Sequence, residues 1–257
     1  MRVIAYSNKG PVRKNNEDAI FVAGNIISGC SISFPIEINT EKHNNSFVVI
    51  DGMGGYEGGE KAAFIVASSF VEANGNWNIP TSSAKNKINL ILNNAVKRII
   101  EAAEDNPELS NMGAALAGVI VCSESILIFN CGDCRIYRQQ GGYLEKISHD
   151  HSIVQELFDN GEIEEDDMRT NAKKNTITAC VSSRISDLNI YFREFSYGQQ
   201  QTRLFICSDG VWEALPIDEL EKCLHESSLE TANNIVKKLF SLQEHCSDNI
   251  SFIIVGN

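Results

Sequence analysis

The chain has little positive charge and no long apolar run, and both shortages exclude classes of protein. Its 257 residues include 22 Lys and Arg against 34 Asp and Glu, a formal net charge of −12 at pH 7. A nucleic-acid-binding face needs clustered basic residues, and so does attraction to an anionic membrane. No apolar stretch approaches the roughly 20 residues of a transmembrane helix. We therefore expect a cytoplasmic protein with no nucleic-acid or membrane partner.

Targeting and linker signals are also missing. The residues from Met1 to Ala5 lack the apolar core and small-residue cleavage site of a signal peptide. No Pro-rich or Gly/Ser-rich linker and no internal repeat divides the chain. Its length suits one domain over residues 1–257 with a sizeable core. We expect this domain to be a monomer.

Eight cysteines are present, and most lie inside apolar runs, where a free cysteine behaves as a small buried hydrophobe. Reduced thiols are expected, because no export signal is seen. Cys131-x-x-Cys134 with His149 and His151 is an alternative zinc site. Its histidines are two residues apart, however, and not the three to five typical of structural zinc.

Short β-like runs recur, and several follow one another with no helix between them, which favours antiparallel pairing. Expected strands cover residues 3–7, 19–23, 47–50, 116–122, 126–130, 135–138, 188–195, 204–207 and 250–255. Apolar periodicity predicts helices over 59–73, from caps at Ser82-Ser83 to 103, and over 152–159, 217–225 and 231–243. The pattern indicates an α+β fold, a four-layer αββα sandwich with two central antiparallel sheets flanked by helix pairs.

Four acidic clusters lie beside these apolar strands. They are Glu17-Asp18, Asp51-Gly52, Asp209-Gly210 and Asp248-Asn249. Carboxylates brought together from distant segments suit a hard divalent cation such as Mg²⁺ or Mn²⁺. Each cluster alone is better explained as a turn, but four of them together favour a metal centre.

Two further segments stand out. Five glycines lie between Asp51 and Glu60, and they allow backbone carbonyls to approach a ligand closely. A phosphate-binding P-loop is excluded there, because the terminal Gly-Lys-Ser/Thr is missing. Residues 162–176 are strongly charged and fit either a solvated loop or a mobile flap beside the site.

The motifs become specific when they are taken in order. The chain carries Arg13-Lys14-Asn15-Asn16-Glu17-Asp18, Asp51-Gly52-Met53-Gly54-Gly55, Asn130-Cys131-Gly132-Asp133, Asp150-His151-Ser152, Ser208-Asp209-Gly210 and Ser247-Asp248-Asn249. This series resembles the metal-dependent protein phosphatases, the type 2C serine/threonine phosphatases, in their compact bacterial form. The resemblance extends from Arg13 to Val255.

The resemblance implies a phosphoprotein phosphatase with a centre of two Mn²⁺ or Mg²⁺ ions. Asp51 would bridge both ions, Asp209 and Asp248 would bind one, and Glu17 with the Gly52 carbonyl would belong to the other. Single residues would have further roles: Asp18 would orient metal-bound waters, Arg13 would bind the substrate phosphate, and Asp133 would bind a weaker third ion. The alternative for Asp133 is a turn residue paired with Arg135.

The chemistry fits these parts. Two cations roughly 3.5–4 Å apart can lower the pKa of a shared water and clamp phosphoryl oxygens, and an arginine fork matches two phosphate oxygens. We expect hydrolysis of phosphoserine and phosphothreonine in proteins phosphorylated by a serine/threonine kinase. Two alternatives are a phosphatase of narrow small-molecule or regulatory-phosphoprotein specificity and a catalytically weak, metal-binding interaction module.

Three segments depart from the family pattern. Gly113-Ala114-Ala115 lacks the usual hydroxyl side chains, which puts hydrogen bonding at that strand end in doubt. Thr178-Ala179-Cys180-Val181-Ser182 lacks the family's arginine and final glycine, so a flap hinge there can differ. Met53 stands where some relatives carry histidine, which leaves protonation of the leaving group to water.

Overall fold

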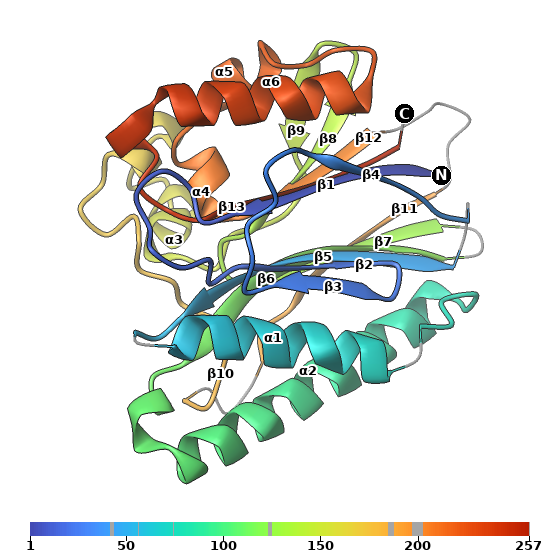
Figure 1. Cartoon of the computed structure of the whole chain (residues 1–257), viewed down its shortest axis with the longest axis vertical. Helices are drawn as coiled ribbons and strands as arrows, with labels where there is room; N and C mark the ends of the chain where they lie inside the picture. The colour runs from blue at the N-terminus through green and yellow to red at the C-terminus, as the bar shows by residue number, and fades with distance from the viewer. Residues whose placement is uncertain are drawn as a thin grey trace.

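Two antiparallel sheets lie face to face in the computed structural model, which describes residues 1–41, 44–55, 57–73, 75–122, 125–184, 188–196 and 203–256 (Figure 1). The first sheet has the order β4-β1-β13-β12-β8-β9. Its strands are β4 (Ile36–Asn39), β1 (Arg2–Asn8), β13 (Ile250–Val255), β12 (Arg203–Cys207), β8 (Arg135–Gln140) and β9 (Tyr143–Lys146). All of these neighbours pair antiparallel, so the predicted pairing mode is confirmed.

The second sheet has the order β11-β7-β6-β5-β2-β3, and β10 pairs with β6 beside this path. Its strands are β11 (Tyr191–Ser196), β7 (Ser125–Cys131), β6 (Gly113–Val121), β5 (Asn45–Met53), β2 (Ala19–Val22), β3 (Asn25–Ser28) and β10 (Val181–Ser182). The long central pair β5 and β6 stays in register from Met53 opposite Gly113 to Asn45 opposite Val121. The missing hydroxyl side chains at Ala114 and Ala115 therefore leave this backbone ladder intact.

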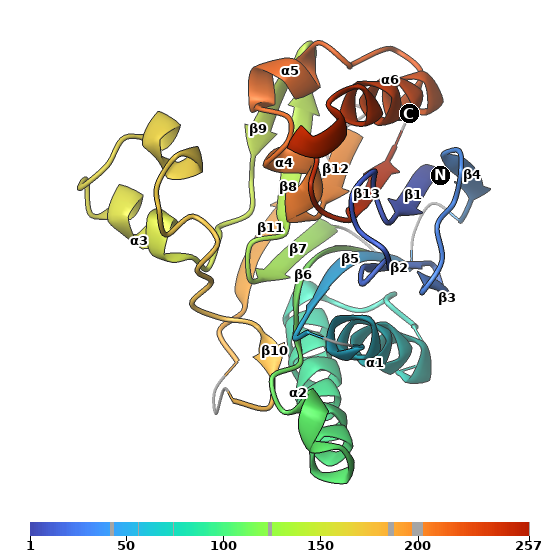
Figure 2. The same ribbon diagram turned by 60° about the vertical axis from the view of Figure 1, so that its left-hand side comes forward.

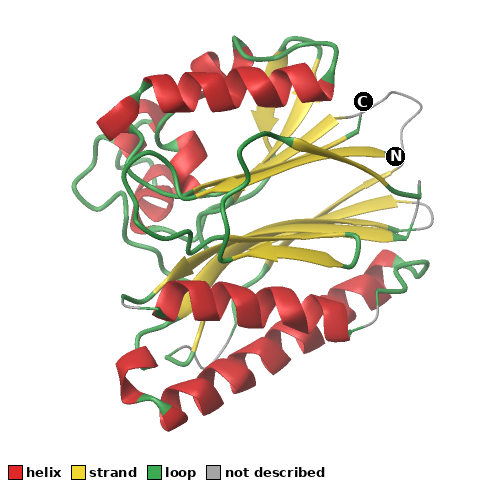
Figure 3. Cartoon of the chain, in the orientation of Figure 1, coloured by secondary structure: helices red, strands yellow, loops and turns green. Residues whose placement is uncertain are grey.

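Helices cover the outer faces of both sheets, which makes four layers (Figure 3). α1 (Gly58–Glu72) and α2 (Thr81–Asp105) lie on the second sheet, and α4 (Asp209–Trp212), α5 (Ile217–Glu221) and α6 (Ser228–Ser241) lie on the first. α3 (Ile153–Asp159) stands to the side of the sheets (Figure 2). Short 3₁₀ turns occupy Pro107–Leu109, Glu165–Arg169 and Gln243–His245. The α+β sandwich is confirmed.

Alternating side chains build the three apolar layers. In β5, Phe47 and Val49 point between the sheets, whereas Val48 and Ile50 pack under α1 and α2. In β1, Val3 and Ala5 are part of the layer between the sheets. Their neighbours Ile4 and Tyr6 pack under α5 and α6. A period of two thus places both faces of each central strand in apolar surroundings.

Several predicted boundaries are wrong for identifiable reasons. Pro80, and not Ser82 or Ser83, precedes the first residue of α2, and no side chain caps that helix. The residues of α4 were predicted as a turn. The strands β3, β4 and β9 were missed, because each has only four residues and lacks a long apolar run. The strand predicted over 188–195 begins only at Tyr191, but its side chains alternate, since Phe192 packs on the layer under the helices and Tyr191 on the layer between the sheets.

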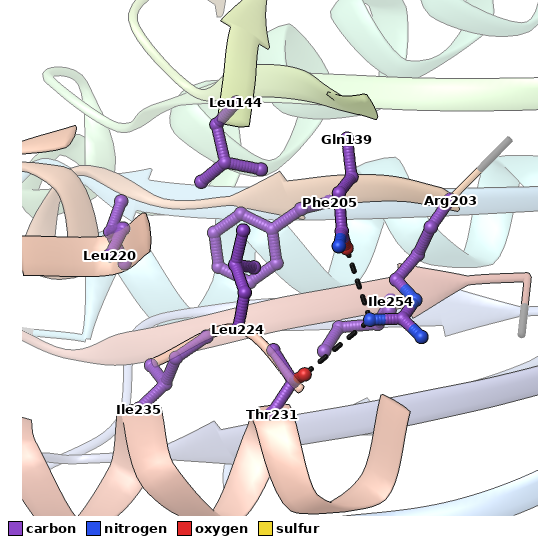
Figure 4. Close-up of a pocket in the computed structure, with 9 residues that line it drawn as sticks. All are labelled: Gln139, Leu144, Arg203, Phe205, Leu220, Leu224, Thr231, Ile235 and Ile254. Atoms are coloured by element: carbon purple, nitrogen blue, oxygen red, sulfur yellow. Dashed lines mark hydrogen bonds between the residues drawn. The ribbon is translucent and has the colours of Figure 1, made fainter. Parts of the chain in front are cut away.

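One small cavity lies between the first sheet and α6, and Figure 4 shows its lining. It holds about 10 Å³, which is room for no more than a single water. The guanidinium of Arg203 is buried beside it and donates to Gln139 Oε1 at 3.0 Å and to the His225 carbonyl at 2.7 Å. This cavity is therefore part of the packing of α6. No helix in the described part of the chain is long and apolar enough to cross a membrane.

Candidate active site

The acidic residues singled out by the sequence meet at one end of the two sheets. Asp51 lies inside β5, opposite Ala115 of β6 and two residues before the strand ends. The apolar run was expected to end at Asp51, but the ladder continues through it to Met53. The Asp51 side chain therefore has a fixed direction, because its backbone is held by the neighbouring strands.

Asp209 and Asp248 come from neighbouring strands of the other sheet. Asp209 is the first residue of α4, just after β12, and Asp248 lies two residues before β13 begins. The two segments touch at Gly210, where a Cβ atom would lie 1.9 Å from the Asn249 carbonyl oxygen. Only glycine fits this close approach, so Gly210 allows the carboxylates of Asp209 and Asp248 to lie near each other.

Glu17 and the Gly52 carbonyl converge on Gly59 at the start of α1. A Cβ atom at Gly59 would lie 2.5 Å from Glu17 Oε2 and 2.8 Å from the Gly52 carbonyl oxygen. Both oxygens thus face one small space that a larger residue would fill. A carboxylate and a backbone carbonyl are oxygen ligands suited to a hard cation, so these residues fit the predicted second ion.

The carboxylates perturb one another strongly. Burial, followed by Asp209 and then Asp18, raises the pKa of Asp51 well above its ordinary value. Burial and the nearby Asp248 raise the pKa of Asp209 to about 6. Buried acids that repel one another are stabilised when a cation neutralises them. The electrostatics of the site therefore fit a divalent metal.

Arg13 lies at the exposed rim of this cluster. Its Nη2 atom donates to Asp248 Oδ2 at 2.6 Å, and its Nε atom donates to the Ser247 carbonyl at 3.2 Å. Within the described ranges, no group of three or more His, Cys, Asp or Glu side chains is set around one point as a metal ion requires.

Asp18 is buried behind the cluster, with 1% of its surface exposed. Burial is the main cause that raises the pKa of Asp18 to about 8. The Ser208 hydroxyl donates to Asp18 Oδ2 at 3.0 Å, and the Ser251 amide donates to Ser208 Oγ at 3.2 Å. In the sequence, Ser208 stands out only as part of the Ser208-Asp209-Gly210 motif. Its contact shows that it orients Asp18 within the cluster.

Asp133 lies in the turn between β7 and β8, and 8% of its surface is exposed. Burial, together with Asp209, raises the pKa of Asp133 to about 8. The predicted alternative partner, Arg135, instead pairs with Asp150 at 2.7 Å and stacks on Trp212 at 3.5 Å from the ring centre. Asp133 thus faces the acidic cluster without the ion pair that the turn hypothesis requires.

The alternative zinc site is not formed. His151 Nδ1 accepts a hydrogen bond from the Gly132 amide at 3.1 Å, and His149 Nε2 lies 2.8 Å from Asp159 Oδ2. Cys131 and Cys134 are buried in different apolar layers, the first under the helices and the second between the sheets. Ser152 caps α3 next to this motif, since its Oγ atom accepts from the Gln155 amide.

Sequence reasoning missed the role of Asn249. Its Oδ1 atom accepts from the Glu17 amide at 2.8 Å. Its Nδ2 atom donates to the carbonyls of Lys9 at 3.1 Å and Asn15 at 2.9 Å. The buried Asn249 side chain therefore holds the loop that carries Arg13 and Glu17 beside Asp248. The only signal in the sequence is that Asn249 follows Asp248 directly.

The charged segment 162–176 contacts the site through Glu213, the residue just after α4. Arg169 Nη2 donates to the Glu213 carbonyl at 2.8 Å. Lys174 Nζ lies 2.9 Å from Glu213 Oε2. This part of the chain stands beside the sheets with α3 (Figure 2). The segment therefore contacts the residue that follows α4, the helix that begins with Asp209. A flap beside the site would make such a contact.

Comparison with known proteins identifies the family. A sequence model described as Protein phosphatase 2C matches residues 35–247. The chain belongs to the protein phosphatase 2C family. The predicted family and the predicted enzyme class, a metal-dependent phosphatase, are thus confirmed.

Relatives and solved structures agree with this assignment. The serine/threonine phosphatase stp of Listeria monocytogenes is 27% identical over 97% of this chain and 93% of its own length. PstP of Mycobacterium tuberculosis is 22% identical over 99% of this chain, which spans only 44% of that longer protein. The crystal structure of Stp1 from Staphylococcus aureus has a TM-score of 0.83 at 22% identity, over 99% of this chain and 94% of that one. The PstP catalytic domain in complex with two manganese ions has a TM-score of 0.76 at 21% identity, over 99% and 98%.

Proposed function

We propose that this protein phosphatase 2C member removes phosphate from phosphoserine and phosphothreonine in proteins, with water activated at a centre of two Mn²⁺ or Mg²⁺ ions. One observation carries the proposal: Glu17, Asp51, Asp209 and Asp248 converge from four distant segments, and burial raises the pKa of three of them. The serine/threonine phosphatases among its relatives support the substrate class. The substrates would be products of a serine/threonine kinase.

The geometry supports a ligand set for these ions. Asp51 would contact both ions, since its carboxylate interacts with that of Asp209 and the next residue, Gly52, directs its carbonyl toward the space that Glu17 faces. Asp209 and Asp248 would complete one site, and Glu17 with the Gly52 carbonyl would contribute to the other. Asp133, which faces Asp209, would hold a weaker third ion. When bound, the two ions lower the pKa of water and withdraw charge from phosphoryl oxygens.

The protein's own groups position the reactants. Arg13 binds the phosphate dianion with its planar guanidinium at the open rim of the cluster. Asp18, which accepts from Ser208, holds waters in place behind the carboxylates. A water oxygen bonds to phosphorus, the bond from phosphorus to the serine or threonine oxygen breaks, and that oxygen leaves as the alcohol. No protein nucleophile is required.

Hydrolysis of para-nitrophenyl phosphate and of a phosphothreonine peptide tests the proposal. Activity should be lost in excess chelator and should return with Mn²⁺ or Mg²⁺. Full activity in chelator would overturn the two-metal centre. Hydrolysis of the small ester without any phosphopeptide turnover would instead favour the alternative of narrow specificity, and metal binding without either activity would favour an interaction module.

A further inference from the structure

A groove of about 600 Å³ runs between β3 and the start of α1. Its lining residues come from these two elements and the residue before the helix: Ile26, Ser28, Glu57, Glu60, Lys61 and Phe64. Phe64 keeps 49% of its surface exposed, which is high for a phenylalanine in a helix against the core. The groove therefore offers both charge and apolar surface to solvent.

The groove adjoins the acidic cluster. Glu60 lies in its wall, and the charge of Glu60 contributes to the raised pKa of Glu17. A Cβ atom at Gly59, the residue before Glu60, would lie 2.5 Å from Glu17 Oε2 and 2.8 Å from the Gly52 carbonyl oxygen. The groove therefore begins beside these two proposed ligands.

We propose that the groove binds the segment that flanks the phosphorylated residue of a protein substrate. This segment would carry Lys or Arg for Glu57 and Glu60, and an apolar side chain for Phe64 and Ile26. The proposal rests on the protein phosphatase function above. It adds a preference for basic and apolar residues near the phosphorylated serine or threonine.

Charge complementarity favours this occupant. The groove has two carboxylates against the single ammonium of Lys61, and neither Glu57 nor Glu60 forms an ion pair with another described residue. The whole chain has a net charge of −12, so its field attracts cationic segments. Carboxylates without a partner gain from a cation that arrives with the substrate, although an exposed pair alone contributes little.

Apolar contact adds a second, independent part of the recognition. Phe64 and Lys61 lie three residues apart in α1 and present ring and charge to the same groove. Covering the exposed part of a phenylalanine removes apolar area from water, which favours binding by any aliphatic side chain. A substrate with both features therefore fits better than one with either alone.

Two phosphothreonine peptides test the proposal. They differ only in the flanking residues, which are Lys and Leu in one peptide and Glu and Ser in the other. The native chain should show a kcat/KM about three- to tenfold higher for the first peptide, and 0.5 M NaCl should reduce this preference because salt screens exposed charges. Glu57→Lys and Phe64→Ala should each lower kcat/KM for the first peptide by about three- to tenfold, with para-nitrophenyl phosphate hydrolysis unchanged.

Matched variants control for general effects. Glu101→Lys changes an exposed charge on α2, and Phe240→Ala removes a ring that is 38% exposed on α6. Both should behave as the native chain. Equal kcat/KM for the two peptides, or equal losses in the control variants, would overturn the proposed role of the groove. Metal-dependent hydrolysis of the small ester in the same experiment would leave the proposed phosphatase function intact. If the native chain hydrolyses nothing, fluorescence anisotropy of the labelled peptides still decides, since the first should bind more tightly and Glu57→Lys should reduce the difference.

Discussion

Arg13 Nη2 donates to Asp248 Oδ2 at 2.6 Å, which joins the proposed phosphate-binding residue to a proposed metal ligand. Their side chains are 51% and 36% exposed, so water competes for the pair and it contributes little to stability. The guanidinium is therefore held at the rim of the acidic cluster without being fixed there. A phosphate that enters the site meets this cation first.

Replacement of Arg13 should impair phosphate binding and leave the fold intact. Arg13→Ala should lower kcat/KM by roughly ten- to a hundredfold, because one charge-assisted contact is worth about 1.5–3 kcal/mol. The melting temperature should be nearly unchanged, since the pair with Asp248 is exposed. Arg13→Lys keeps the charge but lacks the planar guanidinium, so its kcat/KM should lie between those of the native chain and Arg13→Ala. Native kinetics in Arg13→Ala would remove this residue from the site.

Asp209→Asn should abolish most activity and stabilise the metal-free protein. The amide keeps the size of the side chain but removes the charge that holds the cation, so hydrolysis should fall by orders of magnitude. In the folded chain the pKa of Asp209 is raised from 3.8 to about 6. The charged Asp209 carboxylate therefore lowers the free energy of unfolding. This loss is absent below pH 3.8, grows as the pH rises from 3.8 to about 6, and stays constant at higher pH.

Thermal melts in chelator measure this cost. The gain of Asp209→Asn over the native chain should be absent at pH 3.5, appear between pH 4 and 6, and persist at pH 8. Asp105→Asn, at the exposed end of α2, should show no such gain. A native hydrolysis rate with native Mn²⁺ affinity in Asp209→Asn would mean that the proposed ligand set is wrong.

Asp133→Ala separates a third ion from the central pair. Calorimetry should still count two bound Mn²⁺, while turnover of a phosphopeptide at saturating metal should drop severalfold or more. No ion pair is lost in this variant, because Arg135 pairs with Asp150. Asp150→Asn is the matched control: it leaves Arg135 without its buried partner and should destabilise by about 3–5 kcal/mol. Equal turnover in Asp133→Ala, with a lower melting temperature, would leave Asp133 a turn residue.

Asn249 should be required to position Glu17 and Arg13. Asn249→Ala removes three hydrogen bonds from a buried side chain and should cost about 2–4 kcal/mol of stability with a fall in Mn²⁺ affinity. Asn249→Asp keeps the acceptor for the Glu17 amide and loses the two donated bonds. If the Glu17 bond is the one that matters for the metal, Asn249→Asp should retain more Mn²⁺ affinity than Asn249→Ala. Native affinity in both variants would show that the loop holds its place without Asn249.

The sequence by itself determined the layers of the fold. The unbroken apolar run over 47–50 is typical of a strand that is buried on both of its faces, whatever lies against them. The motif order from Arg13 to Asn249 determined the family, because the same side chains recur at the same intervals. Both properties can be recognised from the order of the residues, without the tertiary structure.

Contacts between distant residues could only be decided by the tertiary structure. Neither the pairing of Arg135 with Asp150 nor the three bonds of Asn249 follows from local spacing. The short strand β4 forms because its longer neighbour β1 supplies hydrogen bonds that four residues cannot secure alone, and β3 pairs with β2, which the longer β5 holds in turn. The close approach of Gly52, Gly59 and Glu17 likewise depends on how α1 packs against β5. The sequence identified the candidate carboxylates, whereas the packing of the two sheets determined which of them lie close together.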